Sequence, residues 1–252
     1  MGNLSSTVAP PPKLEQIAPD CFRLRVPFYI FFFDVGTHVN FIRLSNGRFL
    51  VLSAAVVATN PFHTTAFAQW AEVYPRIESE GRLFGTPRHL RNLPGLKWAG
   101  SVEDQSVRDL WKDEVEMRIP AGCEFNNPTP ELTNHFNGIV AFHRASKTVI
   151  CDDAFAVSNP SLLDSFSSCF AFQSQSITFH PSMPNQALYK TPKAARQFYD
   201  WVIELTHDWD FDNMASAHGS YMIGGAKEAL LDCLEKARKS LSDHSLSCPY
   251  TH

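Results

Sequence analysis

The sequence predicts a single α/β domain with strands first, a helix, further strands, and finally two amphipathic helices. Two observations lead to this class. Runs rich in β-branched and aromatic residues alternate with turn residues through most of the chain, whereas apolar residues recur at helical spacing near the carboxyl end. A chain of 252 residues is also long enough for one sizeable hydrophobic core. This order of elements suits two sheets covered by helices, although periodicity alone does not select that architecture.

The first elements are β-favouring. Residues 1–13 are small, polar and proline-rich, so we expect a flexible tail before a domain spanning 14–241, and a second tail at 242–252. Residues 22–26 alternate apolar and basic side chains, and two β-favouring runs follow. These runs are residues 28–33 and 39–44, and the turn Ser45-Asn46-Gly47-Arg48 leads into 49–57. The pattern predicts a β-hairpin that continues into a buried strand.

The middle of the chain combines one helix with several strands. Residues 64–73 carry apolar side chains near helical spacing, and Pro75 ends the run. Further strands are expected at residues 82–85, 114–119, 138–143 and 148–151, and the last of these ends at Asp152-Asp153. We expect the strands 138–143 and 148–151 to pair through the turn between them.

Two helices complete the domain. Thr191-Pro192 is a typical helix start, with threonine as the cap and proline in the first turn, and the apolar residues up to Leu205 form one face. A final helix is expected after Gly224-Gly225, with apolar residues on one side.

Composition excludes several classes of protein. Charged residues make up 19% of the chain, its formal net charge is −4, and no basic stripe is present, so we expect no nucleic-acid partner. Six cysteines without a C-x-x-C pair indicate reduced thiols and a cytoplasmic protein. No apolar run is long enough for a transmembrane segment, and no secretory signal is found. No G-x-S-x-G motif or glycine-rich phosphate loop is present either.

The amino terminus matches a lipidation pattern. Met1-Gly2-Asn3-Leu4-Ser5-Ser6 fits the sequence in which Gly2 is exposed and N-myristoylated. One acyl chain supports only weak membrane association, and no basic cluster or nearby cysteine adds a second signal. The alternative is an unmodified, disordered start.

Separated segments then resemble one known family. Asn60-Pro61-Phe62-His63 follows an apolar strand, Asp152-Asp153 ends another, and Ala217-His218-Gly219 follows Asp208-Trp209-Asp210-Phe211. In this order, the segments resemble the metallo-β-lactamase superfamily over most of the chain after Phe22. The resemblance implies an αββα four-layer sandwich in a single domain. It also implies zinc bound by imidazole and carboxylate ligands on loops at strand ends.

The ligand set that the resemblance implies is reduced. Active members carry H-x-H-x-D-H in the first loop, whereas this chain has His63-Thr64-Thr65-Ala66-Phe67-Ala68, with neither a second histidine nor an aspartate at the required positions. The resemblance assigns His135, with His143 as competitor, Asp153 and His218 to other ligand positions. We therefore expect at most one zinc ion, held by His63, His135, Asp153 and His218, with Asp153 as the catalytic residue. Neighbouring side chains on extended backbone alternate, so only one of Asp152 and Asp153 should face the site.

Two functions remain open at this point. One is a zinc-dependent hydrolase of an unknown small ester, amide or phosphodiester, in which a single ion activates water. The other is a non-catalytic binding or scaffold protein on the same fold, a pseudoenzyme without metal, whose aromatic segment 166–179 could form part of a binding surface or cover the core. The candidate histidines and aspartates would then only hydrogen-bond within turns.

Overall fold

The computed structural model describes most of the chain. The described residues are 13–27, 29–30, 33–34, 36–52, 57–64, 67–131, 133–158 and 175–248. The predicted lipidation motif at Gly2 and most of the aromatic segment 166–179 lie outside them.

Strands from the amino-terminal part form the first sheet, with the antiparallel order β1-β2-β5-β6 among the described residues. Their bounds are β1 (Leu14–Ala18), β2 (Cys21–Val26), β5 (Thr37–Arg43) and β6 (Phe49–Leu52), with β3 (Tyr29–Ile30) and β4 (Phe33–Asp34) as a separate short pair. Bridges from Leu52 to Val57 and from Val57 to Phe84 link this sheet to the parallel pair β7 (Phe84–Gly85) and β8 (Gly100–Ser101). The predicted hairpin is confirmed, since β5 and β6 pair across the turn that contains Gly47.

The second sheet has the order β15-β14-β11-β10-β9. Its strands are β9 (Val115–Arg118), β10 (Val140–His143), β11 (Thr148–Cys151), β14 (Asn213–Ser216) and β15 (Tyr221–Met222), and β12 (Phe155–Ser158) pairs separately with β13 (Ser176–Phe179). The predicted pairing of β10 with β11 is confirmed. β11 and β14 are parallel, with Thr148 opposite Asn213 and Cys151 opposite Ser216. This pairing places the carboxyl ends of two distant strands together.

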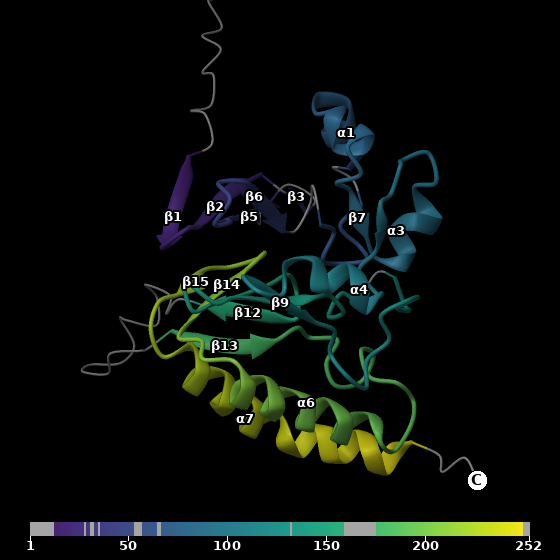
Figure 1. Ribbon diagram of the computed structural model, residues 1–252. Helices are drawn as coiled ribbons and strands as arrows, with labels where there is room; N and C mark the ends of the chain where they lie inside the picture. The colour runs from purple at the N-terminus through teal and green to yellow at the C-terminus, as the bar shows by residue number, and fades with distance from the viewer. Residues whose placement is uncertain are drawn as a thin grey trace, which may run out of the picture.

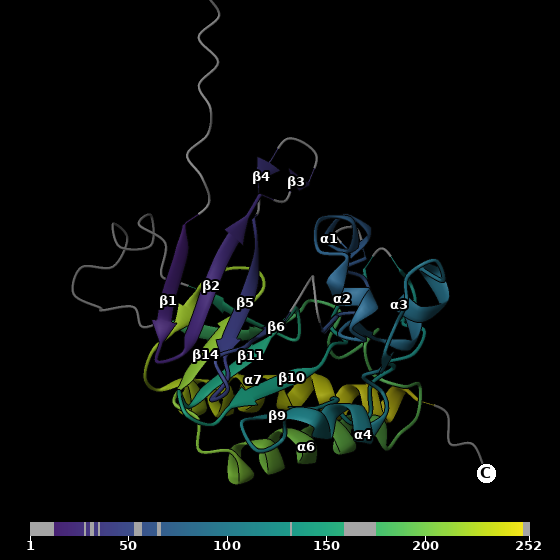
Figure 2. The ribbon, with the colours of Figure 1, turned by 45° about the horizontal axis from the view of Figure 1, so that its top comes forward.

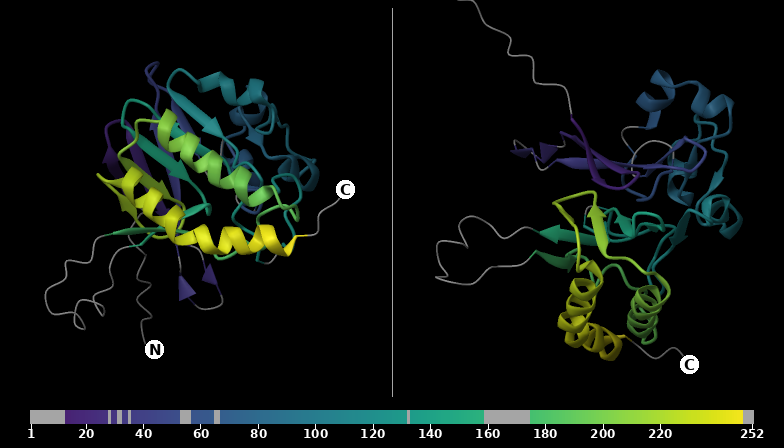
Figure 3. Two further views of the ribbon diagram at one scale, coloured as in Figure 1. Left: turned by 90° about the horizontal axis from the view of Figure 1, so that it is seen from below. Right: turned by 60° about the vertical axis from the view of Figure 1, so that its left-hand side comes forward.

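Helices cover the sheets unequally. Two long helices, α6 (Ala194–Asp208) and α7 (Ala226–Ser247), lie along the outer face of the second sheet (Figures 1 and 3). The short helices α1 (Phe67–Val73), α2 (Arg76–Ser79) and α3 (Pro87–Asn92) gather near β7, whereas α4 (Gln105–Arg108) and the 3₁₀ turn η1 (Asp109–Trp111) precede β9. Figure 1 shows α6 and α7 beneath the two sheets, and α1 and α3 around β7 at the upper right, beside the strands of the first sheet. Within the described residues, no helix has the length and apolar character needed to cross a membrane.

Alternating side chains of the second sheet serve two cores. Ile139, Ala141 and Ile150 point to the first sheet and pack against residues such as Ile42 and Leu52. Their sequence neighbours on the opposite face pack under α6 and α7, and include Val140, Phe142, Val149 and Cys151. The first sheet lies over β11 and β14 in the tilted view of Figure 2. A sheet buried on both faces is rigid, and loops at its edge are held in fixed positions.

Two helix boundaries differ from the sequence predictions. α6 begins at Ala194 rather than at Thr191-Pro192, because the Thr191 carbonyl accepts a hydrogen bond from Ala194 N–H in a separate turn, and Lys193 takes the cap position without a side-chain bond. α7 continues to Ser247, beyond the boundary expected at residue 241. His244 and Cys248 are buried there, so this part of the predicted tail packs against the domain.

Candidate metal centre

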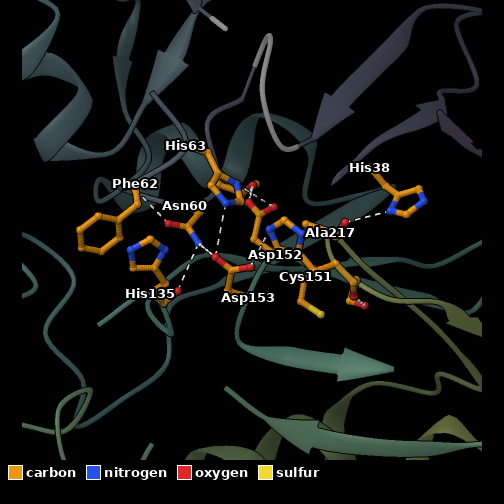
Figure 4. Close-up of polar contacts among 12 residues, drawn as sticks. His38, Asn60, Phe62, His63, His135, Cys151, Asp152, Asp153 and Ala217 are labelled. Carbon is orange, nitrogen blue, oxygen red and sulfur yellow. Dashed lines mark hydrogen bonds and ion pairs between the residues drawn. The ribbon is translucent and has the colours of Figure 1, made fainter. Parts of the chain in front are cut away.

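Three chain segments meet at the edge where the parallel strands β11 and β14 end (Figure 4). Asp152 and Asp153 directly follow β11, and His218 lies two residues after β14. Because the two strands run in the same direction, their carboxyl ends bring these side chains together. His63 arrives from the loop after Val57, which a bridge attaches to the first sheet.

His63 lies between the two carboxylates. Its Nδ1 is 3.4 Å from Asp152 Oδ1, and its Nε2 is 3.3 Å from Asp153 Oδ2. On the other side of Asp153, His218 Nε2 is 3.4 Å from Oδ1. Asp153, but not Asp152, belongs to the group of side chains whose ligand atoms converge, and Asp152 contacts His63 Nδ1 from the bend that follows β11.

Neutral hydrogen-bond partners fix the two aspartates. Asn60 Nδ2 donates to Asp153 Oδ2 at 2.7 Å, while Asn60 Oδ1 accepts from the Phe62 backbone N–H at 2.9 Å. The Thr59 hydroxyl donates to Asp152 Oδ2. Both aspartates and Asn60 are buried, so these bonds form away from bulk water and hold the carboxylates firmly.

The imidazole of His218 has an assigned tautomer. Its Nδ1 is 2.8 Å from the Gly36 carbonyl oxygen, which can only accept, so Nδ1 carries the proton. In the neutral ring, Nε2 then presents a lone pair to Asp153 Oδ1. Two lone pairs at this distance repel each other unless a positive charge lies between them.

The charges of the cluster shift the pKa values of both His63 and Asp153. Burial alone would raise the pKa of the Asp153 carboxyl, but the charges of His63 and His218 and the His63 hydrogen bond outweigh burial and lower the pKa from 3.8 to about 2. Burial would lower the pKa of His63, but the carboxylates of Asp153 and Asp152 raise it well above 6.5. Without a metal, the two carboxylates therefore favour the doubly protonated form of His63.

A histidine that the sequence analysis did not single out supports His63. His89 is fully buried on α3, and its Nε2 donates to the His63 carbonyl oxygen at 3.2 Å. The hydroxyl of Thr86 donates to His89 Nδ1 at 2.8 Å and accepts from the His89 backbone N–H at 3.4 Å as the helix cap. Burial lowers the pKa of His89 to about 4, so the ring is neutral at pH 7. The signal in the sequence was Thr86-Pro87, a helix start of the same type as that proposed at Thr191-Pro192.

His135 differs from the other predicted ligands. Its ring stacks on Phe62, with centroids 4.3 Å apart and planes 3° from parallel, and its Nε2 donates to the Glu131 carbonyl oxygen at 2.8 Å. His180 continues the stack at 6.2 Å. These contacts hold the His135 ring beside the cluster, and the structure places it outside the group of ligand atoms that converge. Its competitor His143 is buried in β10 and bonded to Ser146.

The remaining donor set fits one metal ion. Among the described residues, His63, Asp153 and His218 form the group whose ligand atoms all lie within 4.8 Å of one another. Two atoms bound tetrahedrally to one zinc at about 2.0–2.1 Å lie about 3.3 Å apart. His63 Nε2 is 3.3 Å from Asp153 Oδ2 and His218 Nε2 is 3.4 Å from Asp153 Oδ1, so each distance is near this separation, and each involves a different oxygen of the carboxylate. The imidazole and carboxylate donors could thus bind a metal ion.

Comparisons with known proteins bear on the fold. No protein-family model matches the chain, and no curated protein does. Among solved structures, the DIM-1 metallo-β-lactamase exposed to ceftazidime is similar at 9% identity, with 90% of this chain and 98% of that chain covered and a TM-score of 0.51. The mono-zinc FIM-1 enzyme from Pseudomonas aeruginosa has 11% identity, coverages of 90% and 96%, and a TM-score of 0.49. The chain therefore has a metallo-β-lactamase-like fold.

Proposed function

We propose that His63, Asp153 and His218 hold one divalent metal ion, and that zinc suits these ligands. The observation that carries the proposal is the matched orientation of the two histidines. Each ring has an acceptor at Nδ1, Asp152 for His63 and the Gly36 carbonyl for His218, and each directs Nε2 at Asp153. Metal-binding histidines are oriented in this way by carboxylates and backbone carbonyls. The ligand types, two imidazoles and one carboxylate, are those that zinc accepts.

The activity that this site supports best is hydrolysis of a small ester, amide or phosphodiester. A bound metal ion would supply Lewis-acid chemistry by activating water and polarising the scissile group. Asp153 is ionised at neutral pH, which a metal ligand requires, and its lowered pKa favours the ligand role over that of a proton acceptor. The side chains of His63 and His218 are 20% and 32% exposed, so the cluster is open to solvent on the histidine side.

The second candidate is a non-catalytic binding protein on the same fold. The sequence of the first loop favours it, because the aspartate position of H-x-H-x-D-H is occupied by Phe67 when His63 takes the first position. Such a protein would hold His63 as an imidazolium between Asp152 and Asp153, with no metal. Both candidates predict a folded cluster, and they differ in metal content and turnover.

Metal content and turnover separate the two candidates. Protein purified without chelator is analysed by inductively coupled plasma mass spectrometry, then assayed against esters, lactones, thioesters and phosphodiesters. We expect about one zinc per chain and turnover that Asp153→Asn abolishes, whereas His207→Ala, at a surface histidine paired with Asp208, changes neither. Metal binding without turnover supports a metal-dependent binding protein. Absence of metal from a folded protein supplied with zinc contradicts the proposal.

We also infer that the protein acts in the cytoplasm, with weak membrane association if Gly2 is myristoylated. Support comes from the sequence motif and from cysteines that are unpaired and buried among the described residues. Mass spectrometry of the amino-terminal peptide, from cells that contain N-myristoyltransferase, tests the acylation. A mass increase that Gly2→Ala removes is the expected result, and an unmodified peptide contradicts it.

A further inference from the structure

The turn that carries His218 is held by the opposite sheet. It connects β14 with β15, and three of its carbonyl oxygens accept hydrogen bonds from the first sheet. Arg23 Nη2 donates to Ser216 O at 2.8 Å and to Gly219 O at 3.1 Å. His38 Nδ1 donates to Ala217 O at 2.9 Å (Figure 4). The carbonyls on both sides of His218 are therefore fixed from the other layer of the sandwich.

Arg23 is an unusual residue for its position. It lies on β2 on the same face as Cys21, directed at the second sheet, and is only 3% exposed. A guanidinium is costly to bury unless its N–H groups are bonded. Its Nη2 donates to two carbonyls of the His218 turn, and its Cζ lies 5.7 Å from the centroid of the Tyr221 ring. An apolar side chain here would pack the two sheets at lower cost. The Nη2 contacts of Arg23 link the buried guanidinium to this turn, while its Nε has no hydrogen-bond partner among the described residues.

His38 provides an independent contact on the neighbouring strand β5. The Ala217 carbonyl can only accept, so His38 Nδ1 is the donor. His218 in turn donates from Nδ1 to the carbonyl of Gly36, two residues before His38. The beginning of β5 and the His218 turn are therefore joined by hydrogen bonds in both directions, and the bond to Gly36 sets the direction of the His218 ring.

We propose that Arg23 and His38 are positioning residues, a clamp that holds the turn 216–219 so that His218 directs Nε2 at Asp153. This inference rests on the proposed metal site, because the affinity of that site depends on where the His218 nitrogen lies. A ligand set must be held closely to be effective, and partners that orient ligands strengthen metal binding without touching the ion. The first sheet thereby acts on the site from across the interface between the two sheets.

The test compares matched substitutions. His38→Leu removes the donor, and His38→Asn retains an N–H group near the position of Nδ1. Arg23→Lys keeps the charge but loses the planar guanidinium that spans two carbonyls. Arg43→Gln is the control, since Arg43 also belongs to the first sheet but forms an exposed ion pair with Asp20. Zinc affinity is measured by competition with a chelating indicator, and proton–nitrogen NMR spectra of metal-free protein report the tautomer of His218.

We expect zinc to dissociate about 10-fold or more readily from His38→Leu and Arg23→Lys, the range found when an orienting partner is lost. His38→Asn should recover most of the affinity, and Arg43→Gln should match the unmodified protein. In metal-free His38→Leu, the His218 Nδ1–H signal should weaken while the His63 signals remain. A merely structural role would lower stability without this selective change at His218.

The outcomes for the clamp and for the metal site are separable. Unchanged zinc affinity and an unchanged His218 tautomer in folded His38→Leu and Arg23→Lys overturn the clamp. If the unmodified protein binds no zinc, the proposed function fails, and the NMR comparison in metal-free protein still decides the clamp. If Arg23→Lys does not fold, the pair His38→Leu and His38→Asn decides it alone.

Discussion

At the residue scale, His63 contacts a carboxylate with each ring nitrogen. A neutral imidazole has one N–H and can donate to only one of them. The ring therefore either takes a second proton or gives one nitrogen to a metal ion. Protons and metal compete for the same position, and metal affinity should fall as pH falls.

The first prediction concerns Asp153 in metal-free protein. Its folded-state pKa of about 2 lies below the ordinary 3.8, so its ionised form stabilises the fold above about pH 4, and this contribution is lost as pH falls toward 2. A tenfold change in acidity corresponds to about 1.4 kcal/mol, which gives a contribution of about 2 kcal/mol. Asp153→Asn should remove this part of the pH dependence, as measured by urea unfolding with chelator present.

Asp210→Asn serves as the control for that experiment. Asp210 forms an exposed ion pair with Lys147, and pairs of this kind contribute little to stability. The control should keep the pH dependence of the unmodified protein between pH 4 and 2. Equal acid profiles for Asp153→Asn and the unmodified protein would contradict the assigned role of Asp153.

The site residues that lie in recognisable loops could be predicted from the sequence, but the residues that support them could not. His63, Asp153 and His218 belong to segments with a family pattern, and the structure brings them together. Their roles as ligands stay predictions until metal is measured. His89 and Arg23 donate hydrogen bonds to backbone carbonyls of distant segments. Every residue has a backbone carbonyl, so the sequence does not indicate which one is bonded. The alternation at residues 22–26 also does not tell which face of β2 is buried.

At the element scale, the turn after β14 depends on Gly219. Its φ of +86° is in the left-handed region, and an added Cβ would lie 2.6 Å from the Val157 carbonyl oxygen. Gly219→Ala should therefore displace the His218 turn and weaken zinc binding, in addition to lowering stability. Gly47→Ala is the matched control, with a φ of +78° and no atom within 4 Å of the added Cβ.

The two glycine variants separate backbone strain from steric overlap. Gly47→Ala should cost only the left-handed conformation, about 1–2 kcal/mol, and leave zinc affinity unchanged. Gly219→Ala should cost more, by an overlap contribution of about 1–3 kcal/mol. Chemical unfolding and zinc titration measure both. Similar losses of unfolding free energy in the two variants, with zinc binding intact, would show that the turn does not depend on the close approach of Gly219 to the Val157 carbonyl.

The cap of α3 gives a third prediction, because Thr86 both caps the helix and bonds to His89. Thr86→Ala should lower the free energy of unfolding by about 1 kcal/mol through loss of the cap. It should also loosen the His89 contact with the His63 carbonyl and weaken zinc binding. Thr86→Ser retains the hydroxyl and should restore both properties. A stability loss without any effect on zinc would limit Thr86 to its capping role.

Elements were predictable where local pattern decides them. β11 was expected at residues 148–151 and occupies Thr148–Cys151, because a compact apolar run is bounded by turn residues and aspartates. The start of α6 was not, since Thr191 and Pro192 favour a turn as readily as a helix start. Whether such a segment forms a turn or begins a helix depends on contacts with residues that are distant in the sequence.

At the scale of the whole molecule, the site depends on the parallel pairing of β11 with β14. The sequence of neither strand indicates which strand it pairs with, because the two strands lie far apart in the chain. Period and composition predicted strands and helices, and the family resemblance supplied their order in four layers. That order is confirmed by the sheet topology and by the similarity to a metallo-β-lactamase structure.

The carboxyl end of α7 gives a prediction at this scale. Residues 242–252 were expected to form a tail, but His244 is 3% and Cys248 7% exposed, and His244 Nε2 donates to the Tyr189 carbonyl oxygen at 3.1 Å. Truncation after Leu241 should lower the melting temperature by at least about 3 °C, the shift that about 1 kcal/mol produces in a domain of this size. Truncation after Cys248 is the control. Equal melting temperatures for the two truncations would restore the boundary predicted from the sequence.

The central claim is that His63, Asp153 and His218 together hold one metal ion. The most direct measurement is an equilibrium zinc titration of the unmodified protein and of His63→Ala, Asp153→Asn, His218→Ala and His135→Ala, with folding verified for each. We predict one ion per chain in the unmodified protein and in His135→Ala, and loss of that ion in the other three variants. Equal zinc binding in all five proteins, or none in the folded unmodified protein, would contradict the account.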